Sequence, residues 1–182
     1  MNNNTIDQKL QALLDKQEVL ELIHAYCNAA DRHDNDKMRT LYHEGAIDDH
    51  GPFFKGLASE FIDHLPEIQE PMAILHHNVT TVNLKIDEDR GEGEVYVLAF
   101  HQIESEEGLL DLLIGGRYFD RYEKREGIWK FTHRAVLADW THIHRPSLVA
   151  LDDPLIEGSY IGKPGPDDPS YSFFKTMQRG KR

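Results

Sequence analysis

The sequence predicts an α+β domain in which helices come first and an antiparallel sheet follows. Apolar residues recur at helical spacing from residue 5 to residue 31, with charged residues between them. After residue 75 the apolar period changes to two, and tight turns separate the apolar runs. Long strands joined by such turns form a meander with one apolar face. We expect the sheet to curve and the leading helices to cover that face.

Three helices and one strand are expected before the sheet, over residues 5–31 (helix), 36–42 (helix), 46–55 (strand and turn) and 57–69 (helix). The short second helix has Met38, Leu41 and Tyr42 as its apolar stripe. Gly45 is expected to end that helix, because glycine is common after a last helical turn. Pro71 stops the third helix.

The sheet is expected to contain four strands, over residues 77–86, 91–104, 109–123 and 128–140. The connectors Asp87–Gly91 and Lys124–Gly127 are polar tight turns. Alternate residues of a strand face opposite sides of the sheet. His101 has the same parity as Val95, Val97, Ala99 and Ile103, so we expect it on the apolar inner face.

The last 37 positions differ in composition from the rest of the chain. From Pro146 onward the sequence is rich in Pro, Gly and Asp, and three aromatic residues lie close together near its end, Tyr171, Phe173 and Phe174. A purely disordered tail would seldom carry three aromatics. We therefore expect one domain over residues 1–145, and an extended tail over residues 146–182 that packs on the domain or on a neighbouring subunit.

Composition narrows the classes of function. The formal charge of −12 disfavours binding to nucleic acid or to anionic membrane surfaces. The single cysteine, Cys27, cannot form an internal disulfide, and the first residues lack the features of a signal peptide. A cytoplasmic protein is therefore expected. The sequence has 11 histidines but no His-Glu-x-x-His motif and no glycine-rich nucleotide loop, so we expect neither a metal nor a cofactor.

Two distant segments carry the candidate chemistry. Asp31 closes the first helix, and the pair His76-His77 opens a strand. A carboxylate that orients an imidazole makes a general base that works near neutral pH. Adjacent residues of a strand face opposite sides, so only one of His76 and His77 can meet the carboxylate. The alternative is structural: Asp31 could cap the following turn, and a histidine that opens a strand is often only structural.

The order and spacing of several short segments resemble the SnoaL-like family of the NTF2-like superfamily. These segments are Tyr26-x4-Asp31, His77-x3-Thr81 leading into Leu84–Asp87, Tyr122-x4-Gly127 leading into Phe131, and Asp139-Trp140. The resemblance covers about residues 8–145. The family includes scytalone dehydratase, a hexachlorocyclohexane dehydrochlorinase and a bile-acid dehydratase. The resemblance implies a cone-shaped α+β barrel, with a strongly curved sheet around the N-terminal helices and an apolar pocket inside.

The resemblance also implies site residues. In the lyases of the family an Asp and a His form a catalytic dyad, and these positions match Asp31 and His77. Four further positions match pocket residues and are expected to contact substrate, namely Tyr26, His50, His101 and Tyr118. Other pocket residues of the relatives are replaced by small ones here, at Ala30, Ala99, Gly116 and Ala138. The substrate therefore cannot be carried over from a named relative.

The combined expectation is a cofactor-independent lyase, first of all a dehydratase. Its substrate would be small, hydrophobic and oxygenated, with an aromatic or cyclic skeleton, as in the catabolism of aromatic compounds. The same dyad could instead run an isomerisation, a cyclisation or a retro-aldol cleavage of a phenolic substrate. A further alternative is a non-catalytic ligand-binding module, or an assembly subunit like the small subunit of ring-hydroxylating dioxygenases. The family resemblance implies a homodimer or homotrimer.

Overall fold

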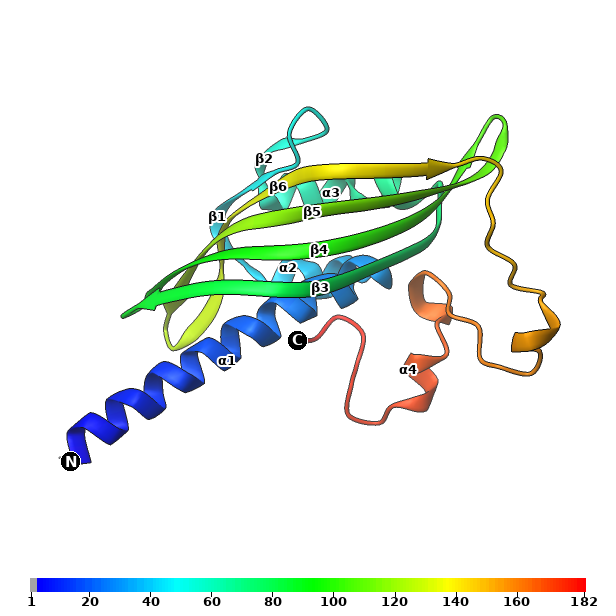
Figure 1. The fold of residues 1–182 in the computed structure, drawn as a ribbon. Helices are drawn as coiled ribbons and strands as arrows, with labels where there is room; N and C mark the ends of the chain where they lie inside the picture. The colour runs from blue at the N-terminus through cyan, green and yellow to red at the C-terminus, as the bar shows by residue number, and fades with distance from the viewer. Residues whose placement is uncertain (1–2) are drawn as a thin grey trace.

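A curved six-stranded sheet wraps one face around three helices (Figure 1). The computed structural model describes residues 3–182. The helices are α1 (Asn3–Asp31), α2 (Asn35–Thr40), α3 (Ala58–Gln69) and the short α4 (Ser170–Phe173). The strands are β1 (Tyr42–Asp49), β2 (Lys55–Leu57), β3 (Met72–Asp87), β4 (Arg90–Ser105), β5 (Gly108–Arg125) and β6 (Ile128–His144). The fold is the α+β class that the sequence predicts, in its cone-shaped form with an unclosed sheet.

The strands follow the order β2-β1-β6-β5-β4-β3. The pairing of β1 with β6 is parallel, and every other pairing is antiparallel. The four strands from β3 to β6 form the expected meander because tight turns join them. The meander leaves β3 at an edge of the sheet, and the end of α1 lies against this edge.

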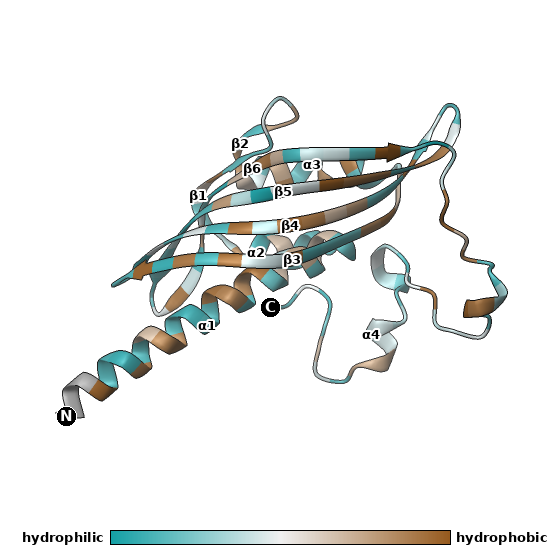
Figure 2. Cartoon of the chain, in the orientation of Figure 1, coloured by the Kyte–Doolittle hydropathy of each residue, from teal (hydrophilic) through white to brown (hydrophobic). Residues whose placement is uncertain are grey.

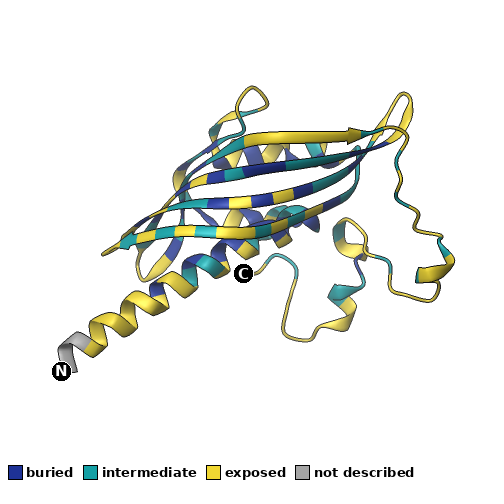
Figure 3. Ribbon diagram, viewed as in Figure 1, coloured by how far each residue is buried: buried dark blue, intermediate teal, exposed yellow. Residues whose placement is uncertain are grey.

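Burial alternates along the strands, as bands of colour in Figure 3 show. In β4, Val95, Val97 and Ala99 are buried, whereas Tyr96 and Leu98 are exposed on the other face. Hydropathy follows the same alternation in part (Figure 2). The inner face therefore forms the core with the helices, and a one-residue shift in register would expose it.

Only the second half of α1 uses its apolar stripe within this chain. Val19, Leu22 and Ile23 are fully buried against the sheet. Residues 6–14 extend beyond the sheet and are exposed (Figures 1 and 3). Four apolar side chains of this extension are about half exposed or more, namely Ile6, Leu10, Leu13 and Leu14.

The four strands of the meander confirm the sequence prediction and extend it by up to five residues at an end. The prediction was wrong at the second helix. This helix ends at Thr40, and Tyr42 begins β1, where it pairs with Phe131 of β6. Gly45 lies inside β1 with a φ of 75°, so it breaks the strand register rather than ending a helix. Pairing with β6, a long-range contact, overrides the local helical pattern.

The segment after β6 crosses back over the domain. Ser147 donates to the Asp111 carboxylate on β5, and the amide of Leu148 donates to the same group. Further along, the Asp168 carboxylate lies 2.7 Å from the Arg32 guanidinium, directly after α1. Hydrogen bonds to Asp168 from Lys163, Ser170 and Arg32 lower the pKa of this carboxyl to about 2, although burial opposes the shift.

Among the described residues, no helix is long and apolar enough to cross a membrane.

A bulge bends the sheet between Gly116 of β5 and the facing part of β6. A Cβ on Gly116 would lie 2.3 Å from the carbonyl oxygen of Leu137, which is a backbone atom. The close approach of the two backbones therefore requires glycine at this position.

We predict that Gly116→Ala lowers the free energy of unfolding by about 1–3 kcal/mol, because the backbone of β6 must shift to admit the methyl group. Urea unfolding measures the loss. Gly56→Ala is the control, because its new Cβ would meet the flexible Glu60 side chain at 3.3 Å. Equal losses in the two variants would contradict the steric explanation.

Candidate functional site

The end of α1 and the start of β3 meet at a carboxylate–imidazole pair. Oδ1 of Asp31 lies 2.6 Å from Nδ1 of His77. The backbone N–H of His77 also donates to Oδ1 and Oδ2 of Asp31, at 3.1 Å each. An ionised carboxylate can only accept hydrogen bonds, so Nδ1 of His77 carries the proton. This leaves Nε2 as the basic nitrogen of the ring.

The edge position of β3 makes this contact possible. An edge strand has backbone N–H groups with no neighbouring strand to bond them. Asp31 satisfies one such group, that of His77, and in the same contact orients the imidazole. His76 is exposed and makes none of these contacts. The strand alternation thus brings His77, and not His76, to the carboxylate.

The pair is shielded but reachable. The side chain of Asp31 is 11% exposed and that of His77 is 12% exposed. Among the described residues, no group forms a hydrogen bond with Nε2 of His77. This atom also does not belong to the buried polar atoms that lack a partner. The basic nitrogen is therefore not fully buried.

His101 lies beside the pair on β4, on the inner face that its parity predicts. Its ring centroid is 5.5 Å from that of His77, and the two rings are nearly perpendicular. Burial, with a smaller contribution from His77, lowers the pKa of His101 to about 4. His101 is therefore neutral at neutral pH, and its Nδ1 is a buried polar atom without a hydrogen-bond partner among the described residues.

His50 follows β1 and belongs to a separate network. Its Nδ1 lies 2.5 Å from Oδ1 of Asp48, a carboxylate that is fully buried. The hydroxyl of Tyr42 donates to Oδ2 of Asp48 at 2.6 Å. The ring of His50 stacks on Phe61 of α3, with centroids 4.5 Å apart.

Tyr26 and Tyr118 lie deeper, in a closed part of the cone. They are 4% and 3% exposed, and their rings meet edge to face at 5.8 Å. The guanidinium of Arg134 lies 3.9 Å from the ring centre of Tyr26 and 4.1 Å from that of Tyr118. Their expected role as substrate contacts stays a prediction, since their rings here pack around a buried cation.

Arg134 and Asp120 form a fully buried ion pair below the site. The guanidinium donates two hydrogen bonds to the carboxylate, at 2.8 and 2.6 Å, and Tyr122 donates a third. Burial opposes the charge of Arg134, but Asp120 more than compensates and holds the pKa above its usual value. Nη1 of Arg134 has no hydrogen-bond partner.

Sequence reasoning left Arg134 undecided and missed Asp48 and Asp120. One feature of the sequence pointed to Arg134. An arginine within the apolar run that contains Trp129 and Phe131 must either face solvent or pair with a buried polar group. A register shift between Arg121 and Tyr122 changes the strand parity nearby, so alternation alone does not locate Arg134. Asp48 and Asp120 lie on other strands, and only the pairing of β1 and β5 with β6 brings them together.

The inner face becomes more open toward the ends of the strands near Asp31. Ile114 and Val136 face inward by register, as Tyr118 does, yet they are only partly buried. Beyond them Ile143, which pairs with the inward-facing Leu112, is 54% exposed. The wall next to the Asp31–His77 pair is therefore apolar, and its side chains pack against the core while staying partly exposed.

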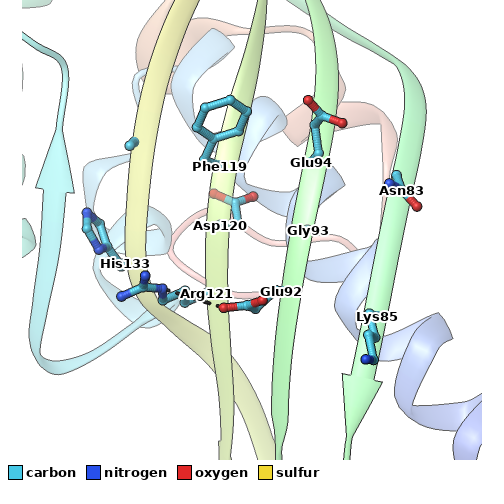
Figure 4. A pocket seen from close by; sticks show the side chains of 10 residues that line it. Asn83, Lys85, Glu92, Gly93, Glu94, Phe119, Asp120, Arg121 and His133 are labelled. Carbon is cyan, nitrogen blue, oxygen red and sulfur yellow. Dashed lines mark ion pairs between the residues drawn. The ribbon is translucent and has the colours of Figure 1, made fainter.

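The structure gives less support to a cysteine nucleophile or a metal site. Burial raises the pKa of the Cys27 thiol to about 12, so this cysteine is a poor nucleophile. Within residues 3–182 no three His, Cys, Asp or Glu side chains are grouped as ligands for a metal ion. A hollow of about 530 Å³ exists on the outer face of the sheet, lined by charged residues such as Lys85, Glu92 and Arg121 (Figure 4). Neither Asp31 nor His77 lines it.

Comparison with known proteins places the fold. A family model described as the SnoaL-like domain matches residues 11–135. Hexachlorocyclohexane dehydrochlorinase LinA, type 2, superposes with a TM-score of 0.71 and 19% identity, over 80% of this chain and 98% of its own. A scytalone dehydratase-like protein from Novosphingobium aromaticivorans has a TM-score of 0.66 and 21% identity. The match covers 72% of this chain and 88% of that protein. Protein Kfla4162 from Kribbella flavida has a TM-score of 0.65 and 21% identity. The match covers 72% of this chain and 95% of that protein. No curated protein matches the chain.

We predict that His101 makes stability depend on pH. As the pH falls, the unfolded chain protonates His101 near 6.5, whereas the folded protein resists protonation until about 4, so stability is lost in that window. Between about pH 7 and about pH 5 the loss should reach about 2 kcal/mol. His101→Gln cannot titrate, so its free energy of unfolding should fall by that much less over the same interval. Urea titrations at the two pH values measure this difference. Parallel pH dependence in the variant and the parent would contradict the prediction.

Proposed function

Because the chain belongs to the SnoaL-like family, and because its cone carries the Asp31–His77 pair beside an apolar wall, we propose that it is a lyase. The observation that carries the proposal is the 2.6 Å contact between Asp31 and His77, which leaves Nε2 of the ring free. A carboxylate-oriented imidazole of this kind is a general base. The names of two structural neighbours, a dehydrochlorinase and a dehydratase-like protein, agree with an elimination.

In the proposed reaction, Nε2 of His77 takes a proton from a carbon next to a carbonyl group. The Asp31 carboxylate stabilises the positive charge that forms on the imidazole and keeps the ring in its tautomer. The electron pair of the C–H bond forms a carbon–carbon double bond, and hydroxide leaves from the adjacent carbon. Neutral His101 lies beside His77, with ring centroids 5.5 Å apart, and we expect it to contact the substrate.

The substrate class follows from the wall of the site. Ile114 and Val136 offer apolar surface, whereas His77 and His101 are polar groups on one side. We expect a small cyclic or aromatic molecule that carries a carbonyl and a hydroxyl group. The same base could serve an isomerisation or a retro-aldol cleavage, since both also begin with proton transfer to His77.

The competing function is a non-catalytic module that holds a hydrophobic ligand or assembles with a larger subunit. Such a module needs no basic nitrogen at the site. The buried, unsatisfied Nδ1 of His101 and the oriented ring of His77 favour the enzyme, because burying polar groups without a chemical role costs stability.

We also propose that the protein forms a homodimer or homotrimer. The support is the exposed apolar stripe on the first half of α1, which includes Leu10 and Leu13. Sedimentation velocity should show a self-associated wild type, and Leu10→Glu with Leu13→Glu should shift it toward the monomer. A monomeric wild type at micromolar concentration would refute this part of the proposal.

The catalytic prediction concerns His77→Ala and Asp31→Asn. Each should lower kcat/KM by at least about 100-fold, because proton abstraction loses its base or the group that orients it. Turnover can be followed by the absorbance of the conjugated product, with a panel of cyclic β-hydroxy ketones that carry a phenol ring.

His76→Ala is the matched control, since this exposed neighbour makes no contact with Asp31. It should keep near wild-type activity, and circular dichroism should confirm that all three variants are folded. Near wild-type turnover in both His77→Ala and Asp31→Asn would refute the dyad. A wild type that binds members of the panel but converts none would favour the binding module.

A further inference from the structure

The cone contains a second carboxylate–imidazole pair, Asp48 with His50, that repeats the arrangement of the first. In both pairs Nδ1 of the ring meets one carboxylate oxygen, at 2.5 Å for His50 and 2.6 Å for His77. In both pairs the second carboxylate oxygen accepts another hydrogen bond, from the Tyr42 hydroxyl at Asp48 and from the backbone N–H at Asp31. Both rings therefore carry the proton on Nδ1 and present Nε2.

The register of β1 directs Asp48 into the cone. Asp48 pairs with Arg134 of β6, and the side chains of both residues are fully buried. His50 follows two residues later, so it leaves the strand on the same side. Its ring stacks on Phe61, which is itself buried in the core that lies between α3 and the sheet.

The Nε2 atom of His50 is open to a ligand. The side chain is 22% exposed. In the described part of the chain no group bonds to Nε2 of His50, and this nitrogen is not among the buried atoms that lack partners. Its basic nitrogen is thus solvent-accessible, as that of His77 is.

The two pairs are connected through α1. Tyr26 of α1 meets the ring of Tyr42 at 6.4 Å, and Tyr42 holds Asp48. Asp31 follows Tyr26 by five residues on the same helix, a rise of about 7.5 Å. The first pair lies on the β3 edge and the second beside β6, so they belong to opposite walls of the cone.

We propose that His50 is a second catalytic residue of the lyase, the general acid that protonates the departing oxygen, and that Asp48 positions it. This inference rests on the proposed function. In this proposal the two Nε2 atoms face one substrate, with the acidic C–H bond toward His77 and the hydroxyl group of the adjacent carbon toward His50. The substrate class that needs both is a β-hydroxy carbonyl compound, because hydroxide is a poor leaving group without a proton.

The proposed step balances without a further reactant. His77 removes the proton from carbon, the carbon–carbon double bond forms, and the C–O bond breaks. The departing oxygen takes the proton of the His50 imidazolium and leaves as water. His77 ends protonated and His50 neutral, and exchange of one proton through solvent restores both. The buried Asp48 carboxylate holds Nδ1 of His50 and so directs Nε2 away from the strand.

A structural role for the Asp48–His50 pair is the alternative, since it also ties the end of β1 to α3. Leaving-group dependence separates the two roles. Hydroxide departs at a useful rate only if a general acid protonates it. A leaving group such as 4-nitrophenoxide departs without a proton, so loss of the acid changes its rate of departure little. A variant with a disturbed fold would lose both reactions equally.

The experiment compares one cyclic β-hydroxy ketone with the same ketone carrying a β-(4-nitrophenoxy) group. For His50→Gln we expect kcat/KM to fall about 100-fold or more with the hydroxy ketone and less than about 3-fold with the nitrophenoxy ketone. For His77→Gln we expect large losses with both, because both reactions need the base. His64→Gln is the matched control, an exposed histidine on the same helix as Phe61.

Asp48→Asn should show the selectivity of His50→Gln, together with a shift of the alkaline limb of the pH profile for the hydroxy ketone to lower pH, because a general acid must be protonated to act. Nitrogen-15 NMR of the histidines should also show that the low-field Nδ1 proton of His50 is lost in Asp48→Asn and kept in His64→Gln. This signal does not depend on turnover.

The outcomes are distinct. Equal losses with the two substrates in His50→Gln, or no loss with either, would overturn the acid role and leave the His77 base intact. Absence of turnover by the wild type with both substrates would overturn the proposed lyase and the acid role with it.

Discussion

The contact between Asp31 and His77 sets the geometry on which the other features of the site depend. The Asp31 carboxylate accepts hydrogen bonds from Nδ1 and from the backbone N–H of His77. It therefore joins the last residue of α1 to the edge strand of the sheet. A backbone donor at a sheet edge needs a partner, and a helix end offers few groups that can reach one. The same contact therefore stabilises the fold, fixes the angle at which α1 leaves the sheet and orients the basic nitrogen.

The interior of the cone is divided into a closed floor and an open mouth. At the floor, Arg134 is paired with Asp120 and surrounded by the rings of Tyr26, Tyr118 and Phe131. A buried cation requires such partners because transfer from water is costly. Toward the ends of the strands near Asp31 the inward-facing apolar side chains are only partly covered, and the imidazole of His77 lies there.

Local patterns account for how well the strands and the position of His101 were predicted. A strand alternates its side chains strictly, so parity with Val97 and Ala99 is enough to place His101 on the inner face. Prediction was wrong at Tyr42 and Gly45, where pairing between β1 and β6 converts a helical pattern into a strand. Asp48 and Asp120 were missed for a related reason, since their partners His50, Tyr42 and Arg134 are specified by strand pairing and side-chain packing.

The sequence by itself determined the fold class and the strands of the meander, because periodicity is a local property that the chain carries unfolded or folded. The family resemblance of its short segments selected Asp31 and His77. Only the tertiary structure decided that the Asp31 carboxylate bonds both Nδ1 and the backbone N–H of His77, that Arg134 is buried as an ion pair, and that Asp48 and His50 form a second oriented imidazole. These are contacts between elements, and their geometry depends on the curvature, bulges and register of a sheet that forms only when the helices pack against it.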